Sequence, residues 1–168
     1  MTKRLSAAIV LSLTLALGAM APASAMTPDY ASQYYLNSVC PTIPAWSRVI
    51  QSLSQGSHLV RANQVKGQRL RRARAALLAL QRTDFTSAGH LTNTPSEWPT
   101  PEAAAATSKV ATALLRERLV IAELRTRSRA SFARYWNRVF LPQDRRVVSY
   151  WRLAMASLSI PPNGNLGC

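Results

Sequence analysis

The chain has 168 residues, of which 48% are hydrophobic and 17% charged, and its formal net charge is +14. This length suits one domain with a packed core, and it excludes a two-domain enzyme with separate cofactor and substrate lobes. With two histidines, two cysteines and seven carboxylates, the chain also lacks the residues for most catalytic constellations.

The N-terminal segment has the pattern of a secretory signal peptide. Two basic residues precede an apolar run over 5–21, and the small residues at 23–25 precede a cleavage point after Ala25. The run is short for a retained membrane span, and no cysteine stands directly after the cleavage point to accept a lipid. We therefore expect a cleaved signal peptide over 1–25 and a secreted or extracytoplasmic, envelope-associated domain over 26–168.

Cys40 and Cys168 are the two cysteines of the chain. An oxidising compartment favours their pairing, which would tether the turn-rich tail over 159–168. A catalytic thiol is the alternative, but the chain has no C-x-x-C motif and neither cysteine has an obvious histidine or acidic partner in its neighbourhood. We expect a structural disulfide.

Helix-start signals and apolar periodicity divide the domain into helices. Thr27 and Thr100 each precede a proline and an acid, which is the pattern of an N-cap followed by a first helical turn. The sequence predicts helices over 28–38, 44–54, 57–82, 101–140 and 142–158, with a long loop over 83–99. We expect an all-α fold, an antiparallel helical bundle of three long helices plus shorter N-terminal helices, stapled by one disulfide.

Two groups of cations stand out, and the first of them has no acidic residue beside it to neutralise its charge. The first group holds five cations within nine residues, and the second occupies one sector of the long predicted helix beside its apolar stripe. A solvated face and snorkelling side chains are the ordinary interpretations, and an ion network with Glu117 is a further one for the second group. The candidate anion-binding residues are Lys66, Arg69, Arg71, Arg72, Arg74, Arg118, Arg125 and Arg129.

The sequence contains few candidate catalytic or metal-binding residues. His90, Asp84 and Glu97 share one segment, but their spacing matches no known metal site, so we expect no metal and no small-molecule cofactor. No nucleophile motif is present, and no catalytic residue is predicted. An enzyme would require the loop over 83–99 to cover a pocket that holds Glu117 or His90.

Short motifs resemble a group of uncharacterised small exported all-helical proteins of actinobacteria, many of which look like lipoproteins. These motifs are the segment 35–41 ending in Cys-Pro, the Trp98-Pro99 pair before a long helix, and the tail over 158–168 ending in Gly-Cys. The resemblance implies export, helices and a Cys40–Cys168 bridge, and it implies no activity. This chain departs from the group because it lacks the lipid-attachment cysteine.

The strong positive charge of the chain is the basis of the functional hypothesis. A strongly positive chain is tolerated where anionic partners are plentiful. We expect an exported, non-enzymatic basic protein that associates with the cell envelope or an anionic ligand, through an anionic polymer or a lipid surface. The alternative is a secreted nucleic-acid-binding or membrane-active basic protein. The sequence does not decide the oligomeric state.

Overall fold

The computed structural model describes residues 24–53, 59–162 and 166–168, so most of the predicted signal peptide lies outside the described residues. The described chain is helical throughout, apart from its connections and one isolated bridge between Ala25 and Glu97. The elements are α1 Pro28–Val39, α2 Thr42–Leu53, the 3-10 helix η1 Ala62–Gln64, α3 Gly67–Thr92, α4 Pro101–Thr126, α5 Arg129–Tyr135, the π-helix η2 Trp136–Phe140 and α6 Leu141–Ser157.

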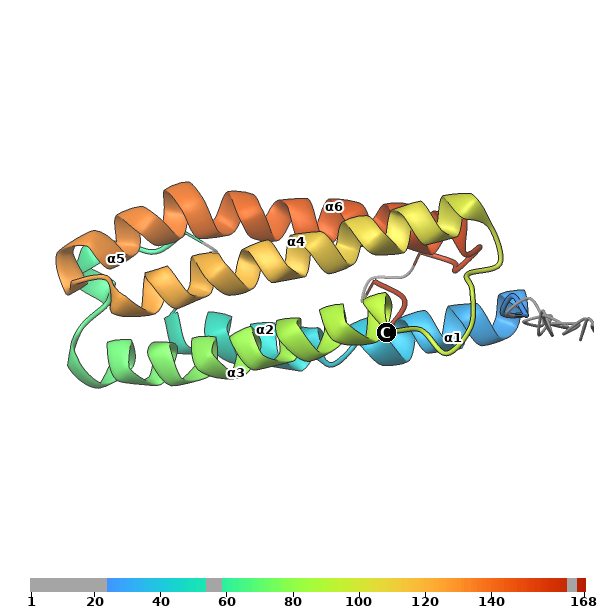
Figure 1. Ribbon diagram of the computed structural model, residues 1–168. Coiled ribbons are helices and arrows are strands. Elements are labelled where there is room, and N and C mark those ends of the chain that lie inside the picture. Colours follow the sequence, from blue (N-terminus) through green and yellow to red (C-terminus); the bar gives the residue numbers. More distant parts are fainter. Residues whose placement is uncertain (1–23, 54–58, 163–165) are drawn as a thin grey trace, which may run out of the picture.

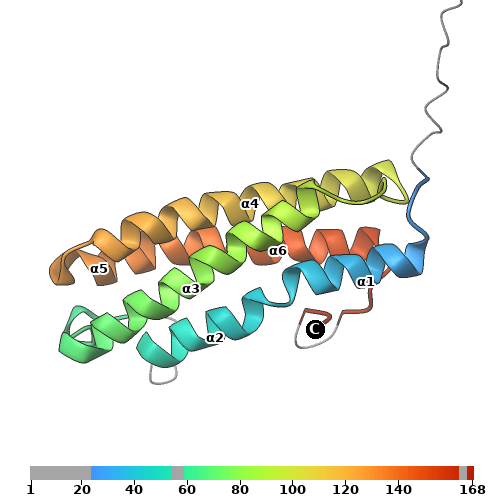
Figure 2. The ribbon, with the colours of Figure 1, turned by 60° about the horizontal axis from the view of Figure 1, so that its bottom comes forward.

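These elements form four antiparallel arms around one axis (Figures 1 and 2). The short helices α1 and α2 make the first arm, α3 and α4 the next two, and the contiguous α5, η2 and α6 the last. α2 packs along α3, α3 along α4, and α4 along α6. The predicted all-α bundle of three long helices plus shorter N-terminal ones is confirmed. None of the described helices is long and apolar enough to cross a membrane.

Both predicted proline-containing helix starts are present. The Thr27 side chain accepts a hydrogen bond from the amide of Tyr30 at 3.4 Å, and the Thr100 side chain accepts one from the amide of Ala103 at 3.1 Å. Each hydroxyl satisfies one of the amides that a first helical turn leaves without an intrahelical partner. α2 starts two residues earlier than expected, at Thr42, whose hydroxyl donates to the Val39 carbonyl.

The expected helix over 57–82 and the loop over 83–99 are wrong. Residues 59–66 hold only the short η1, and residues 57 and 58 lie outside the described chain. α3 begins at Gly67 and continues to Thr92, so only residues 93–100 connect it to α4. Three of the four residues buried in its last turns, Asp84, Ser87 and Ala88, are small or polar, and a search for large apolar residues overlooks them.

The expected helix over 101–140 is also wrong, because the chain turns after Thr126. Arg127 takes an extended conformation with ψ of 140°, and Ser128 caps the next helix by accepting from the amide of Ser131. Neither proline nor glycine marks this turn in the sequence. The α4–α5 turn therefore places Arg129 on a different helix from Arg118 and Arg125, and the three do not share one helical sector.

The expected helix over 142–158 is present as α6 Leu141–Ser157, but it continues directly from η2, so the last arm passes through Pro142. Proline within a helix lacks an amide donor and its ring crowds the carbonyl four residues earlier. Here the π-helical turn η2 precedes it, and the Leu141 amide donates to the carbonyl of Trp136, five residues back. This wider turn lets a continuous helical path run from Arg129 to Ser157.

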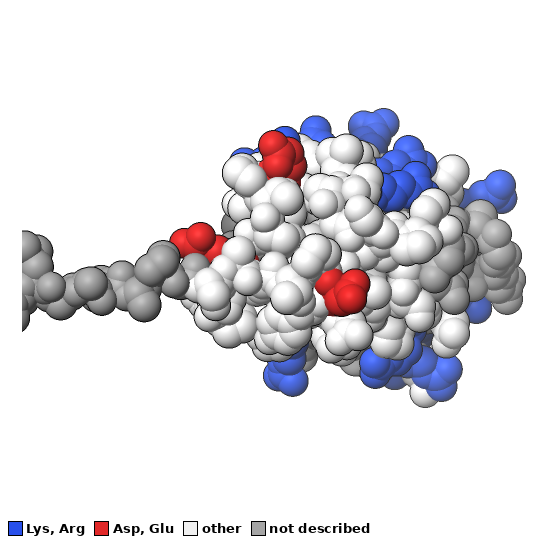
Figure 3. Space-filling model, turned by 90° about the vertical axis from the view of Figure 1, so that its right-hand side faces the viewer, with Lys and Arg blue, Asp and Glu red and all other residues white. Residues whose placement is uncertain are grey.

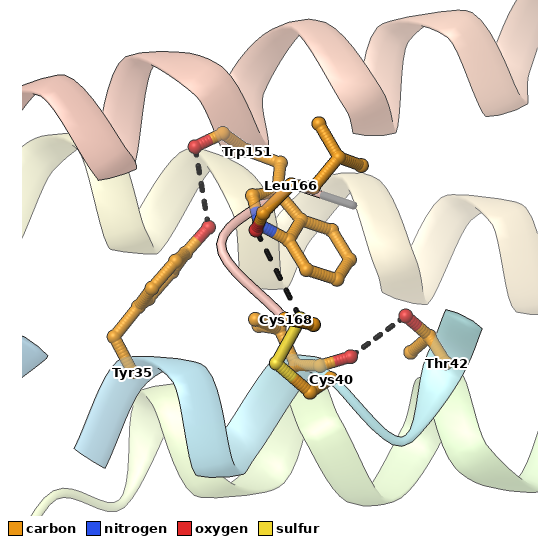
Figure 4. The surroundings of a disulfide bond; sticks show 7 residues. Tyr35, Cys40, Thr42, Trp151, Leu166 and Cys168 are labelled. Carbon is orange, nitrogen blue, oxygen red and sulfur yellow. Dashed lines mark hydrogen bonds between the residues drawn. A yellow bond between two sulfur atoms is a disulfide. The ribbon is translucent and has the colours of Figure 1, made fainter. Parts of the chain in front are cut away.

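The C-terminal tail folds back onto the first arm, as predicted. Cys40 and Cys168 form a disulfide with a Cα–Cα distance of 5.7 Å at the junction of α1 and α2. The carbonyl of Leu166 accepts a hydrogen bond from the Trp151 indole at 3.1 Å, and the Tyr35 hydroxyl donates to the Trp151 carbonyl at 3.3 Å (Figure 4). The disulfide therefore holds the tail against α6 as well as α1.

Removal of this disulfide, in the variant Cys40→Ser/Cys168→Ser, is expected to destabilise the fold. The bond joins residues 128 positions apart, so the chain-entropy argument gives a loss of up to about 5 kcal/mol in the free energy of unfolding. Urea unfolding followed by circular dichroism measures the loss. A reductant should destabilise the natural protein and leave the variant unchanged; equal unfolding free energies for the two proteins would contradict the prediction.

Candidate functional site

A pocket of about 380 Å³ lies in the bundle between α2 and α6. Its sides are residues of α2 and α6, its floor is formed by α3 and α4, and Leu166 of the tethered tail closes one edge. The lining residues are Thr42, Ile43, Trp46, Ser47, Leu80, Asp84, Leu114, Glu117, Asp144, Val147, Val148, Trp151 and Leu166. The pocket is thus apolar over most of its wall, with three acids placed in it.

The three acids come from three different helices. Asp84 lies on α3, Glu117 on α4 and Asp144 on α6. From the first arm, the indole of Trp46 on α2 donates a hydrogen bond of 2.5 Å to Asp144. The pocket therefore depends on the assembly of all four arms.

Asp84 and Glu117 are almost completely buried, with exposures of 1% and 2%. Both carboxyl oxygens of Asp84 and one of Glu117 have no hydrogen-bond partner within the protein. Burial raises the pKa of Asp84 well above its usual range, and the charge of Asp144 raises it further. Burial, followed by repulsion from Asp84 and Asp144, does the same to the pKa of Glu117. Both groups therefore retain protons to a higher pH than ordinary carboxyls do.

The acid layer (Asp84, Glu117 and Asp144) divides the hydrophobic core into two clusters. One cluster packs around Tyr35 and Trp151, and the other around Trp136 and its neighbouring phenylalanines. On each of the three helices, the acid lies between a residue of one cluster and a residue of the other. The flanking residues are Ala88, Leu114 and Val147 of the Tyr35–Trp151 cluster and Leu80, Ile121 and Leu141 of the Trp136 cluster. A polar layer at the middle of a core costs stability, and such costs are typical of functional sites.

A second feature is the basic end of the bundle, which we define as residues 61–74 and 125–138. The antiparallel arms bring the start of α3 beside the end of α4 and α5 (Figures 1 and 2). Most of the predicted anion-binding residues meet here. The cations of the basic end are Arg61, Lys66, Arg69, Arg71, Arg72, Arg74, Arg125, Arg127, Arg129, Arg134 and Arg138.

The predicted cations differ in how the structure uses them. Lys66, Arg71, Arg72 and Arg129 are exposed, and Arg69 is partly exposed. Two partly buried arginines, one from each predicted group, donate hydrogen bonds to uncharged oxygens of another helix or turn. These bonds run from Arg74 to the Arg127 carbonyl at 2.7 Å and from Arg125 to the Gln81 side chain at 2.8 Å. Neither contact neutralises the positive charge of its arginine.

Arg118 lies outside the basic end. Its guanidinium stacks over the ring of Phe85 with the central carbon 4.5 Å from the ring centroid. This contact joins α4 to α3 and covers part of an aromatic ring that is otherwise exposed. The predicted ion network with Glu117 is not what the structure shows for Arg118.

Glu123 borders the basic end, one helical turn before Arg127, and it is already engaged. Arg127 forms an ion pair with it, and the Tyr135 hydroxyl donates to it at 2.5 Å. Hydrogen bonding from Tyr135 is the main cause that lowers the pKa of Glu123, while burial and this bond raise the pKa of Tyr135 to about 12. Glu123 thus fixes the α4–α5 turn and compensates little of the surrounding charge.

The opposite end of the bundle carries the other acids. Residues 24–47, 83–108 and 153–168 contain no lysine or arginine. Asp29, Glu97 and Glu102 are exposed there, at the starts of α1 and α4 and in their vicinity. Viewed from this end, acidic side chains lie on the face and Lys and Arg lie toward its margins (Figure 3). The molecule is therefore charge-polarised along its length.

The remaining candidate, His90, is exposed at the end of α3, where its backbone carbonyl accepts from the Tyr34 hydroxyl. It does not enter the pocket. Asp84, from the segment predicted as a loop, does line a pocket with Glu117, although it does so from a helix. Within the described residues, no group of three His, Cys, Asp or Glu side chains is placed to hold a metal ion.

The acid layer is missed by motif searches because its members are 33 and 27 residues apart in order along the chain. A detectable signal was present on each helix. Asp84 continues the buried stripe of Leu77 and Leu80, and Glu117 follows Leu114 by three residues. An acid on an apolar stripe therefore indicates the site, but only packing shows that three such acids meet.

The acid layer predicts an unusual dependence of stability on pH. Unfolded carboxyls lose their protons near pH 4, whereas folded Asp84 and Glu117 keep theirs, so the free energy of unfolding should fall as pH rises above about 4. The slope should reach about 1.4 kcal/mol per pH unit for each group over the interval where only the unfolded form has ionised. Urea unfolding from about pH 5 to about pH 8 measures it.

The variant Asp84→Asn/Glu117→Gln should flatten this dependence and be more stable than the natural protein at neutral pH. The variant Glu97→Gln/Glu102→Gln, which removes two exposed acids, is the matched control and should keep the natural slope. A natural protein whose unfolding free energy rises with pH across this range would show that the buried acids are ionised in the fold.

Comparison with known proteins leaves the site to be judged on its own residues. No family model matches the chain, and neither the curated proteins nor the solved structures contain a significant match to it. The geometry of the acid layer and of the basic end is therefore the observation on which function is argued.

Proposed function

We propose that this protein is exported, is not an enzyme, and associates with an anionic polymer of the cell envelope through its basic end. The observation that carries the proposal is the presence of cations from residues 61–74 and 125–138 together at one end of the bundle. The signal-peptide pattern and the disulfide support an oxidising, extracytoplasmic location.

The distribution of acids strengthens the argument from net charge. Three of the seven acids belong to the acid layer inside the bundle, and three more lie at the opposite end. Glu123, the remaining acid, is bound by Arg127 and Tyr135. Concentrated like charge opposes compact folding, and it is compensated when a polyanion neutralises it. The asymmetric charge also orients the approach of such a partner.

A polymer suits this surface better than a small anion does. The exposed cations Lys66, Arg71, Arg72 and Arg129 are spread over two helices and the residue before α3 instead of converging on one point. Repeated phosphate or carboxylate groups along a flexible chain match that spread. Membrane insertion is disfavoured, since the apolar stripes of the helices are buried in the two core clusters.

The variant Lys66→Gln/Arg71→Gln/Arg72→Gln is expected to weaken binding to cell-wall fragments isolated from an actinobacterium. Each cation that contacts an anionic group releases a counterion. The removal of each such cation should therefore lower the affinity and reduce the logarithmic salt slope by about one, so the triple variant should lose about three. Co-sedimentation across a salt series measures both quantities.

The matched control is Arg48→Gln/Lys109→Gln/Arg152→Gln, which removes the same number of charges from positions outside the basic end. It should retain most of the binding. Equal losses of affinity in the two variants would show that net charge, and not the basic end, governs association. Stronger binding to duplex DNA, or leakage of anionic-lipid vesicles, would replace the proposal by the nucleic-acid-binding or membrane-active alternative.

A further inference from the structure

We propose that the central pocket binds a small organic amine, with its ammonium group on Asp84 and Glu117 and its apolar body against Trp46 and Trp151. This site is separate from the basic end, and the inference does not rest on association with the envelope. It follows from three properties of the pocket, which are its unpartnered oxygens, its one-signed charge and its walls.

The first property is the set of unpartnered acceptors. Both oxygens of Asp84 and one of Glu117 are buried without a hydrogen-bond donor from the protein, and both residues line the pocket. Nearly all buried polar atoms in proteins have a partner, because an unpaired one costs the free energy of its lost hydration. An ammonium group has up to three N–H donors, which match these acceptors in number and in charge.

The second property is charge. The pocket lining contains three acids and, among these described residues, no lysine, arginine or histidine. This selection is notable in a chain with 21 basic residues against seven acidic ones. A carboxylate away from water interacts strongly with a cation and repels an anion. The pocket therefore favours a ligand opposite in sign to the partner of the basic end.

The third property is the apolar wall, which favours an organic cation over a metal ion. Ile43, Leu80, Leu114, Val147 and Val148 line the pocket beside the two tryptophans. A hydrocarbon body removes these side chains from water, and an indole face attracts a cation. A volume of about 380 Å³ falls within the range of pockets that hold small organic ligands.

The pocket residues are buried to different degrees, and this difference sets the orientation of the ligand. Asp84 and Glu117 are the buried floor, whereas Trp46, Val148 and Leu166 are only partly buried and form the rim between α2 and α6. An amine would enter with its charged group first. The Trp46–Asp144 hydrogen bond spans the same rim, so the aromatic wall and the acid layer are positioned together.

Binding of the amine should be coupled to proton release. The groups that face the pocket are Asp84 on α3, Glu117 on α4 and Asp144 on α6, and α2 contributes Trp46. Because the first two hold protons to a raised pH, an ammonium ion that binds them must displace a proton to solvent. Affinity should therefore increase as pH rises until these groups are ionised in the free protein.

Isothermal titration calorimetry of the disulfide-intact protein with phenethylamine tests the inference. We expect saturable binding with proton release, seen as a dependence of the measured heat on the ionisation enthalpy of the buffer. Phenethyl alcohol has the same body without the charge and should bind at least about tenfold more weakly. Benzyltrimethylammonium has charge but no N–H donor and should also bind more weakly than the amine.

The variants Glu117→Gln and Asp84→Asn should each lower affinity for phenethylamine by about ten- to hundredfold, as expected for loss of a charged hydrogen-bond partner. Glu102→Gln, an exposed acid outside the pocket, is the matched control and should bind as the natural protein does. Circular dichroism verifies that each variant is folded, and two independent pocket variants guard against the failure of one.

Three outcomes would overturn the inference. One is equal affinity for the amine and the alcohol, and another is unchanged affinity in both folded pocket variants. The third is that neither phenethylamine nor benzyltrimethylammonium binds at millimolar concentration. Binding of calcium or manganese ions without binding of these organic cations would count as the same outcome. None of these results depends on whether the basic end binds a polyanion, so this failure is distinguishable from failure of the proposed function.

Discussion

Each of the four helical arms has one apolar stripe, and the burial of these stripes against one another is the constraint on which the whole structure depends. The stripes meet in two clusters, around Tyr35 with Trp151 and around Trp136. Basic side chains are consequently displaced to the surface. The acid layer is the exception, since it occupies the level of the bundle where both clusters end.

The disulfide and the tail connect this constraint to the pocket. Cys168 is bonded to Cys40 at the α1–α2 junction, which brings Leu166 onto the pocket edge and within hydrogen-bond distance of Trp151. Gly167 takes a φ of 86°, and a side chain there would come within 2.9 Å of Leu36. The tail is thus a close-fitting wall, and a bond at the surface helps to shape a site within the core.

Charge is separated in two directions in this protein. Along the length of the bundle, many cations lie at the basic end and the exposed acids Asp29, Glu97 and Glu102 lie at the opposite end. From the surface to the centre, the surface is rich in arginine, whereas the acid layer lies inside the bundle. The two arrangements favour ligands of opposite sign. A polyanion on the surface and an amine in the core are therefore compatible on one molecule, because each is drawn to a region that repels the other.

The sequence by itself determined the all-helical class, the proline-marked starts of α1 and α4, and the Cys40–Cys168 bond, because these depend on local capping, periodicity and the presence of only two cysteines. It did not reveal the turn at Ser128 or the passage of the last arm through Pro142. A serine can cap a helix or lie within one, and a proline can begin a helix or follow a widened turn inside one, so packing against neighbouring arms decides between these outcomes. Only the tertiary structure decided the acid layer, since the burial of Asp84, Glu117 and Asp144 together results from helices distant in sequence meeting at one level.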